Sequence, residues 1–438
     1  MVAGVQERAL ACMHAFPPQA VANSMWALAH LCRGQGPRAD VLAALLDRIA
    51  LTRAAGFQPI AIANVLWSMA VLRRPVPTAV WCALLARTRS QLVALRPQTV
   101  SNILWAVATL RVSAPLHLDV LRAGGQVGGG LEDGGGDGGD RGGGGSRQVE
   151  DELVEVLLQR SLDCAADFCP QAIASTIWAL ATLKRPPPPA LLVALQTTGA
   201  LSPQAWQPQG VALTMWALAS LNVDILPVLL RRLLTEAQEQ AQAFSPQAVA
   251  NLLWACWTMR VDPGRELVRV LTMRSVQVAG DFSAQSISML LWSLASAEHD
   301  LPPSLAAAIT RQAAECRDDF TPQGISCVLW AFASLKVQPD AALLDTLLRQ
   351  STAQAAALDA QSTANVLWAL AALGEHELPS AVAHTLVAAV ERCAPMLLPQ
   401  GVANTLWALA CLRLPPDSQP LLVRALDALA LRIAVSRP

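Results

Sequence analysis

The segment that decides the fold is Phe244–Met259, which reads Phe-Ser-Pro-Gln-Ala-Val-Ala-Asn-Leu-Leu-Trp-Ala-Cys-Trp-Thr-Met. It combines a large apolar residue, a residue that can cap a helix, a proline suited to a first helical turn, and apolar side chains at helical spacing. Copies of this segment recur along the chain, each centred on a tryptophan that corresponds to Trp254. These tryptophans occupy positions 26, 67, 105, 178, 216, 254, 292, 330, 368 and 407.

The spacing of the tryptophans defines a repeat. Successive ones are 41, 38, 73, 38, 38, 38, 38, 38 and 39 residues apart, and the interval of 73 equals one 38-residue repeat plus 35 further residues. Within that interval, residues 124–145 hold 14 of the 25 glycines of the protein, a composition typical of a flexible insertion. The insertion lacks the Gly-Lys-Ser/Thr ending of a phosphate-binding loop, which argues against nucleotide binding there.

Positions in each repeat are numbered here from its tryptophan, which is position 0. A large apolar residue stands at −10 in most repeats, Pro at −8 in eight of ten, and Val or Ile at −5 in nine of ten, the layout of a hydrophobic staple with a proline start. Small Ala or Ser at −4, +1 and usually +3 allow a neighbouring helix to approach closely. A second amphipathic segment follows each tryptophan helix, for example at residues 341–353.

We therefore predict an all-α fold, an α-solenoid of about ten tandem 38-residue helix-turn-helix repeats. Repeats 1–3 are expected in residues 1–112, with a partial helix before the first. A Gly-rich flexible insertion is expected at 113–150, and repeats 4–10 at 151–438.

The composition argues against a membrane protein and against an enzyme. The chain is 53% hydrophobic and 15% charged, but no apolar run reaches the ~18–20 residues of a spanning helix, so no membrane insertion is expected. The ten cysteines show no zinc-site spacing, and we interpret them as buried free thiols. No catalytic motif is present, so we expect no catalytic residues, no metal site, no cofactor and no enzymatic activity.

The pattern Phe-x-Pro-Gln-x-Val/Ile-Ala-Asn-x-Leu-Trp-Ala-Leu-Ala-x-Leu, matched with small departures at Phe244–Met259 and Leu397–Leu412, closely resembles octotricopeptide repeats. The period and the Pro-rich connection at Pro186–Pro189 agree with that family. Similar helical repeats occur in FAST-kinase-like and RAP-domain proteins, although we find no RAP-like domain and no clear transit peptide in this chain. The resemblance implies a chloroplast or mitochondrial protein that binds single-stranded mRNA or rRNA. Such proteins act in RNA stability, processing or translation, with RNA-processing proteins as further partners.

A stripe of mostly polar residues runs along the tryptophan helix at −7, −3 and +4. Nine repeats carry Gln at −7, and this near-constant residue is either a scaffold that bonds backbone near the helix start or a ligand contact. Position −3 varies between repeats, as base-reading positions must, although these side chains could instead form a ladder of hydrogen bonds to neighbouring repeats. The base-reading candidates are Asn23, Asn64, Asn102, Ser175, Asn251, Asn365 and Asn404.

Two further features bear on RNA binding. The repeat tryptophans are interpreted as core residues, with base-stacking platforms as the alternative. Cations at +6, or +7 in the first repeat, could neutralise phosphates, or could equally complement the dipole at the helix C-terminus. These phosphate-binding candidates are Arg33, Arg73, Arg111, Lys184, Arg260, Lys336 and Arg413.

The net charge is small for a nucleic-acid-binding protein. It is −1 overall, and residues 113–150 carry three basic and six acidic side chains, which leaves +2 for the repeats. We predict sequence-selective binding of single-stranded RNA at up to about one base per repeat. A protein-binding scaffold of the HEAT or armadillo type, and a structural subunit associated with organellar ribosomes, remain alternatives.

Overall fold

The computed structural model describes residues 10, 13–32, 37–111, 144–375 and 377–435. These residues form helices joined by short loops, and the β-structure among them is one isolated bridge between Glu377 and Arg413. The predicted all-α solenoid is confirmed, because the described residues form ten helix pairs that pack in tandem.

Each pair begins with the tryptophan helix, called here the A helix. The A helices are α2 (Pro18–Leu31), α4 (Pro59–Val71), α6 (Pro97–Arg111), α9 (Pro170–Thr182), α11 (Pro208–Ser220), α13 (Pro246–Thr258), α15 (Ala284–Ser296), α17 (Pro322–Ser334), α19 (Ala360–Leu373) and α21 (Pro399–Cys411).

The second helix of each pair is called the B helix. The B helices are α3 (Ala39–Leu51), α5 (Thr78–Ser90), α8 (Gly144–Asp163), α10 (Pro189–Leu201), α12 (Pro227–Glu239), α14 (Arg265–Gln277), α16 (Pro303–Glu315), α18 (Ala341–Ala353), α20 (Ser380–Cys393) and α22 (Gln419–Val435). Short 3₁₀ turns lie at Met13–Ala15, Leu92–Ala94, Ala165–Asp167, Ala241–Ala243, Ala279–Asp281, Arg317–Asp319, Ala355–Ala357, Ala394–Met396 and Pro416–Ser418.

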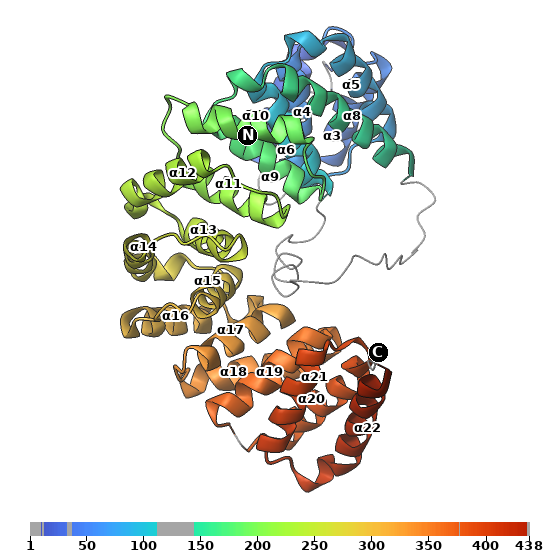
Figure 1. The fold of residues 1–438 in the computed structure, drawn as a ribbon. Coiled ribbons are helices and arrows are strands. Elements are labelled where there is room, and N and C mark those ends of the chain that lie inside the picture. Colours follow the sequence, from blue (N-terminus) through green and yellow to red (C-terminus); the bar gives the residue numbers. More distant parts are fainter. Residues whose placement is uncertain (1–9, 11–12, 33–36, 112–143, 376, 436–438) are drawn as a thin grey trace. The chain divides into compact units, whose positions relative to one another are not determined.

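The described residues group into two compact units, the first up to residue 236 and the second from residue 237 on. In the first, A helices α2, α4, α6, α9 and α11 pack each on the next, and B helices α3, α5, α8 and α10 form a second layer. In the second, the A layer runs from α13 to α21 and the B layer from α14 to α22 (Figure 1). Each unit is thus a two-layered stack whose core lies between the A and B layers.

The A helices begin as the sequence predicts. The side chains of Ser245, Ser283, Thr321 and Asp359 each accept a hydrogen bond from the backbone N–H three residues later, so the predicted caps are confirmed. The apolar side chain at −10 is buried in the core, as at Phe244, which is fully buried. Cap and staple together fix where each A helix starts.

The insertion lies between α6 and α8, inside one helix pair. Most of its predicted range, 113–150, falls outside the described residues, but residues 144–150 form the first turns of α8. Compared with α5, α8 is longer at its N-terminus, 20 residues against 13. Because α8 packs on α5 and α6, the repeats on both sides of the insertion belong to the same unit, and the boundary between units falls at residue 236 instead.

A contact that the sequence did not predict closes each return loop. A long polar side chain near the end of the B helix donates to the backbone carbonyl at −10, which precedes the A helix of the same pair. The pairs are Arg87 with Phe57, Arg160 with Leu95, Arg274 with Phe244, Gln312 with Phe282, Gln354 with Phe320, Arg392 with Leu358, and Arg432 with Leu397, at 2.8–3.1 Å. These donors satisfy carbonyls that the loop would otherwise bury without a partner.

Candidate nucleic-acid interface

One face of each A helix carries the amide residues and the repeat tryptophan together. At 100° per residue, positions −7, −3, 0 and +4 fall within about 60° of one another on the helix surface. The core positions −5, −1 and +2 lie on the other side, and their side chains are buried in most repeats, as at Val249, Leu253 and Cys256. The surface formed by positions −7, −3, 0 and +4 is called here the A face.

Gln at −7 and Asn at −3 form a hydrogen-bonded pair that recurs along the chain. The Gln Nε2 donates to the Asn Oδ1 one turn later, at 2.9–3.0 Å, in Gln19–Asn23, Gln98–Asn102, Gln361–Asn365 and Gln400–Asn404. Because the Asn oxygen is occupied, the Asn NH₂ is left as a donor beside the Gln oxygen, which is an acceptor. The pair therefore presents one donor and one acceptor side by side.

The structure places the base-reading candidates at different depths. Asn23 is exposed, and Asn64, Asn102, Ser175, Asn365 and Asn404 are half-buried at the surface. Asn251 is only 4% exposed, so a base cannot reach it in this conformation. In the four pairs the Asn oxygen bonds within its own helix, which differs from the ladder between repeats that was the alternative.

The tryptophans are less buried than predicted. Core packing holds for Trp216 and Trp254, which are 4% and 0% exposed, but Trp26 and Trp407 are 45% and 47% exposed. The other six repeat tryptophans are half-buried. The prediction of core packing is wrong for these eight because position 0 lies two turns from −7 and so belongs to the A face, not to the core stripe.

Aromatic rings meet between neighbouring A helices of the first unit. His30, at +4 of α2, stacks on Trp67 of α4 with ring centroids 5.0 Å apart and an interplanar angle of 25°. Trp105 of α6 stacks on Trp178 of α9 at 6.3 Å and 27°. The rings of adjacent repeats therefore form short stacked rows on the A face, with some ring surface still open to solvent.

The residue at +6 has a fixed backbone role that the sequence only partly indicated. In seven repeats it adopts a left-handed conformation just past the A helix: Arg73, Lys184, Asn222, Arg260, Glu298, Lys336 and Gly374 have φ between 50° and 82°. In each, the +6 N–H donates to the carbonyl at +3 and the +7 N–H to the carbonyl at +2. At Lys336 these distances are 3.2 Å to Ala333 and 3.0 Å for the following amide to Phe332. This is a Schellman helix end, a position at which glycine is the usual residue.

The cations at this edge differ in their surroundings. Arg33 lies outside the described residues. Arg73, Lys184, Arg260 and Lys336 are exposed, and within the described part of the chain no carboxylate pairs with Arg73, Arg260 or Lys336. Arg413 lies 3.3 Å from Glu377.

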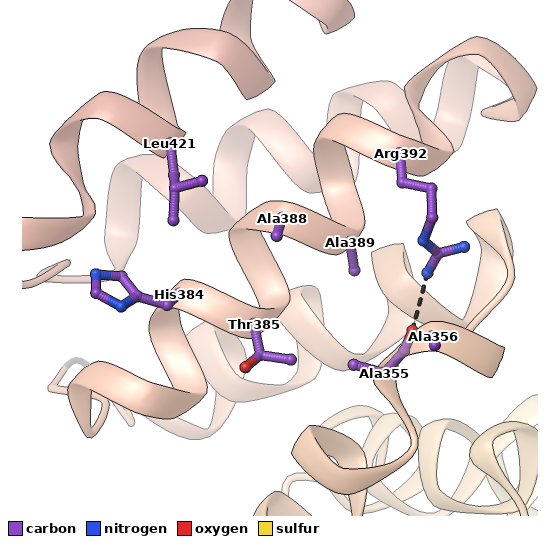
Figure 2. A pocket seen from close by; sticks show the side chains of 8 residues that line it. All are labelled: Ala355, Ala356, His384, Thr385, Ala388, Ala389, Arg392 and Leu421. Atoms are coloured by element: carbon purple, nitrogen blue, oxygen red, sulfur yellow. Dashed lines mark hydrogen bonds between the residues drawn. The ribbon is translucent and has the colours of Figure 1, made fainter.

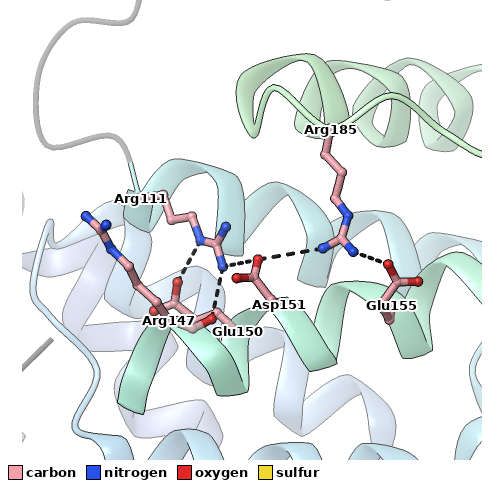
Figure 3. Close-up of polar contacts among 6 residues, drawn as sticks. All are labelled: Arg111, Arg147, Glu150, Asp151, Glu155 and Arg185. Carbon is pink, nitrogen blue, oxygen red and sulfur yellow. Dashed lines mark hydrogen bonds and ion pairs between the residues drawn. The ribbon is translucent and has the colours of Figure 1, made fainter. Parts of the chain in front are cut away.

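Arg111 is neutralised by α8. Its guanidinium lies 2.7 Å from Glu150 and 2.9 Å from Asp151, while Arg185 pairs with Asp151 and Glu155 (Figure 3). Burial lowers the pKa of Arg111, but the two carboxylates outweigh that effect and raise it above the ordinary value. Its charge is already compensated, so Arg111 holds the start of α8 against α6 and offers little attraction to a phosphate.

A shallow depression of about 490 Å³ lies on the B-helix side of the second unit, lined by Ala355, Ala356, His384, Thr385, Ala388, Ala389, Arg392 and Leu421 (Figure 2). Arg392 uses its guanidinium to bond the carbonyls of Ala355 and Leu358, both at 2.9 Å. Among the described residues, no group of three or more His, Cys, Asp or Glu side chains is arranged to hold a metal ion. In that same part of the chain, no helix is both long enough and apolar enough to cross a membrane.

Comparison with known proteins relates part of the chain to a translation factor. Residues 108–301, less than half of the chain, match the family model of the Tbc2 translation factor, N-terminal domain. No match was found among curated proteins.

The chain also shows a weak likeness to solved structures. One is a homology model of the full-length AP-3 complex in an intermediate open conformation, with 10% identity, 95% of this chain and 81% of that chain covered, and a TM-score of 0.26. Another is the crystal structure of an engineered protein, with 11% identity, 97% and 98% covered, and a TM-score of 0.21. At such TM-scores neither carries an argument about fold or function.

Proposed function

We propose that this protein binds single-stranded RNA through the A face and that it acts in translation, without catalytic activity of its own. The observation that carries the proposal is the recurring Gln–Asn pair beside a partly exposed tryptophan. An amide edge reads the hydrogen-bonding groups of an unpaired base, and an indole face stacks on it. The match of residues 108–301 to a translation factor domain supports the role in translation.

The Gln at −7 has a positioning role in this proposal. Its amide fixes which end of the Asn side chain faces outward, and a fixed donor discriminates between bases better than an amide that can rotate. Repeats that carry an apolar residue at −3, namely Leu213, Met289 and Cys327, lack this pair and offer no equivalent polar edge. Recognition would then alternate between base-reading repeats and repeats that contribute mainly stacking.

The cations at +6 would bind the phosphate backbone from the rim of the A face. A left-handed conformation costs a residue with a side chain about 1–2 kcal/mol, yet Arg73, Lys184, Arg260 and Lys336 all adopt it where glycine would be unstrained. The helix dipole returns only about 0.3–1 kcal/mol to each cation. This imbalance favours a use for the charge beyond helix capping.

The cellular setting follows from the resemblance to octotricopeptide repeats, which favours the chloroplast or the mitochondrion and a role in the stability, processing or translation of organellar transcripts. RNA-processing proteins are the further partners that this setting implies. A structural role on an organellar ribosome would use the same A face on rRNA.

The test is selection from a random single-stranded RNA pool by the purified protein at two salt concentrations, followed by sequencing of the bound fraction. The variant Asn365→Ala/Asn404→Ala removes two pairs on adjacent A helices, and Thr346→Ala/Thr385→Ala makes matched changes on the B helices α18 and α20. We expect the first to lose base preference at two neighbouring positions, with about a tenfold or greater loss of affinity for the enriched motif. Its salt dependence should stay unchanged, because the amides do not contact phosphate.

The control variant should bind as the unchanged protein does. If the unchanged protein retains no more RNA at low salt than a neutral protein of similar size, the RNA proposal fails. A protein-binding scaffold of the HEAT or armadillo type would then be the function to pursue. If RNA is retained but the Asn variant keeps the same motif, base reading by the Gln–Asn pairs is refuted.

A further inference from the structure

Successive A helices within a unit meet through small side chains at fixed positions. A Cβ built on Gly210 or Gly401, both at −6, would lie 3.8 Å from the Cβ of Ala174 or Ala364, which stand at −4 of the preceding repeat. The Ser288 hydroxyl, also at −4, donates to the carbonyl of Gly324 at 3.2 Å. By helix geometry +3 lies beside −4, and −2 and +1 lie beside −6. Each A helix thus has a forward face, at −4 and +3, and a backward face, at −6, −2 and +1.

The forward face is buried in every A helix except the last. The residues at −4 in the other nine helices, Ala22, Ala63, Ser101, Ala174, Ala212, Ala250, Ser288, Ser326 and Ala364, are 0–2% exposed. In α21 the equivalent Ala403 is exposed, and so is Ala410 at +3. Beside them on α22, Val423, Leu426 and Ile433 are 40–56% exposed. The last helix pair therefore leaves open a surface of the kind that receives the next repeat elsewhere.

The backward face is buried in every A helix except the first. The residues at −2 and +1 in the nine helices from α4 to α21 are 0–1% exposed. In α2 the equivalents, Ser24 and Ala27, are half-buried, as is Ala20 at −6. All three are small, so α2 can approach another helix as closely as the internal A helices approach one another.

We infer that the forward face of α21 binds the backward face of α2 in a second copy of this chain, so that the protein associates head to tail. The contact continues the interface already built between repeats, since Ala403 and Ala410 would receive Ala20, Ser24 and Ala27 as Ala174 receives the −6 residue of the following repeat. A head-to-tail contact uses a different surface on each partner and does not close on itself after two copies. Association should therefore proceed beyond a dimer as concentration rises.

The test is the mass of the 438-residue protein in solution, measured by sedimentation over a range of concentrations, together with the variants Ala403→Arg and Ala20→Arg. The unchanged protein should exceed its monomer mass of 46.4 kDa increasingly as concentration rises. Each variant keeps only one competent end and should remain at the monomer mass. A mixture of the two should reach twice that mass and go no further, because Ala403→Arg still offers its α2 and Ala20→Arg still offers its α21.

Ala372→Arg is the control, since Ala372 is an exposed alanine of α19 outside the forward face. It should associate as the unchanged protein does, and Ala410→Arg should repeat the effect of Ala403→Arg. A protein that stays at 46.4 kDa at all concentrations overturns the inference. So does association that Ala403→Arg abolishes and Ala20→Arg leaves intact, because that result means a tail-to-tail contact. No RNA enters the measurement, so its outcome is independent of the RNA proposal.

Discussion

Lys336 allows the backbone and charge roles of the +6 position to be separated. Helix α17 ends at Ser334, and Lys336 follows in a left-handed conformation with φ of 55°. We compare Lys336→Gly with Lys336→Ala. Both variants lose the cation, so the difference between them reports only the backbone.

The expected difference follows from two opposing terms. A left-handed conformation costs a residue with a Cβ about 1–2 kcal/mol, which alanine keeps and glycine avoids. Glycine gives up about 0.4–1 kcal/mol of that gain, because its unfolded chain has more conformations to lose. The glycine variant should therefore be more stable than the alanine variant by about 1 kcal/mol. The alanine variant should fall below the unchanged protein by about 0.3–1 kcal/mol at low salt, since it loses the attraction between cation and helix end.

Urea unfolding followed by circular dichroism measures the stabilities, and the midpoints can be compared where the slopes are equal. Ser334→Gly and Ser334→Ala serve as the control, because two residues earlier, inside the helix, glycine should be less stable than alanine by about 1 kcal/mol. RNA binding by the two Lys336 variants should lose the same salt dependence, about 0.7 in the slope of log affinity against log salt. An alanine variant as stable as the glycine variant would refute the left-handed helix end at Lys336.

Three further predictions concern other parts of the fold. Gly199→Ala should destabilise the protein by about 1–3 kcal/mol, because the new Cβ would lie 2.8 Å from a buried tryptophan ring, and urea unfolding would show it. Burial raises the pKa of Cys256 and of Cys327 to about 12, so at pH 8 alkylation of the folded protein, read by mass spectrometry, should modify the exposed Cys82 and spare both. Since an unfolded thiol ionises near pH ~8.5, the stabilising effect of these two thiols is complete below that pH and should be lost between there and pH 12, visible as a falling unfolding midpoint. Arg111→Ala should increase amide hydrogen exchange at residues 144–151 more than elsewhere in α8, because it removes the ion pairs that hold this segment.

The helices and their starts could be read from the sequence with little loss. Proline at −8, the capping residue at −9 and the apolar pair at −10 and −5 act within one turn of chain, so a local pattern specifies them. The small residues at −4 and +1 likewise announced the close contact between A helices. The tryptophans were harder to place. A large apolar ring in a Leu- and Ala-rich segment is usually core, and only the helical wheel of the folded repeat shows that position 0 shares its face with −7 and −3.

The sequence by itself determined the repeat, its period, the two-helix unit and the rows of amides and cations, because each depends on spacing along the chain. The tertiary structure alone decided which of those side chains are accessible and what each one bonds. Asn251 and Asn365 occupy the same repeat position, yet one is buried and the other lies at the surface in a pair with Gln361. Arg111 and Lys336 likewise share +6, but the carboxylates of α8, brought in by the chain after the insertion, neutralise only Arg111. Such differences depend on residues distant in sequence, which no local pattern contains.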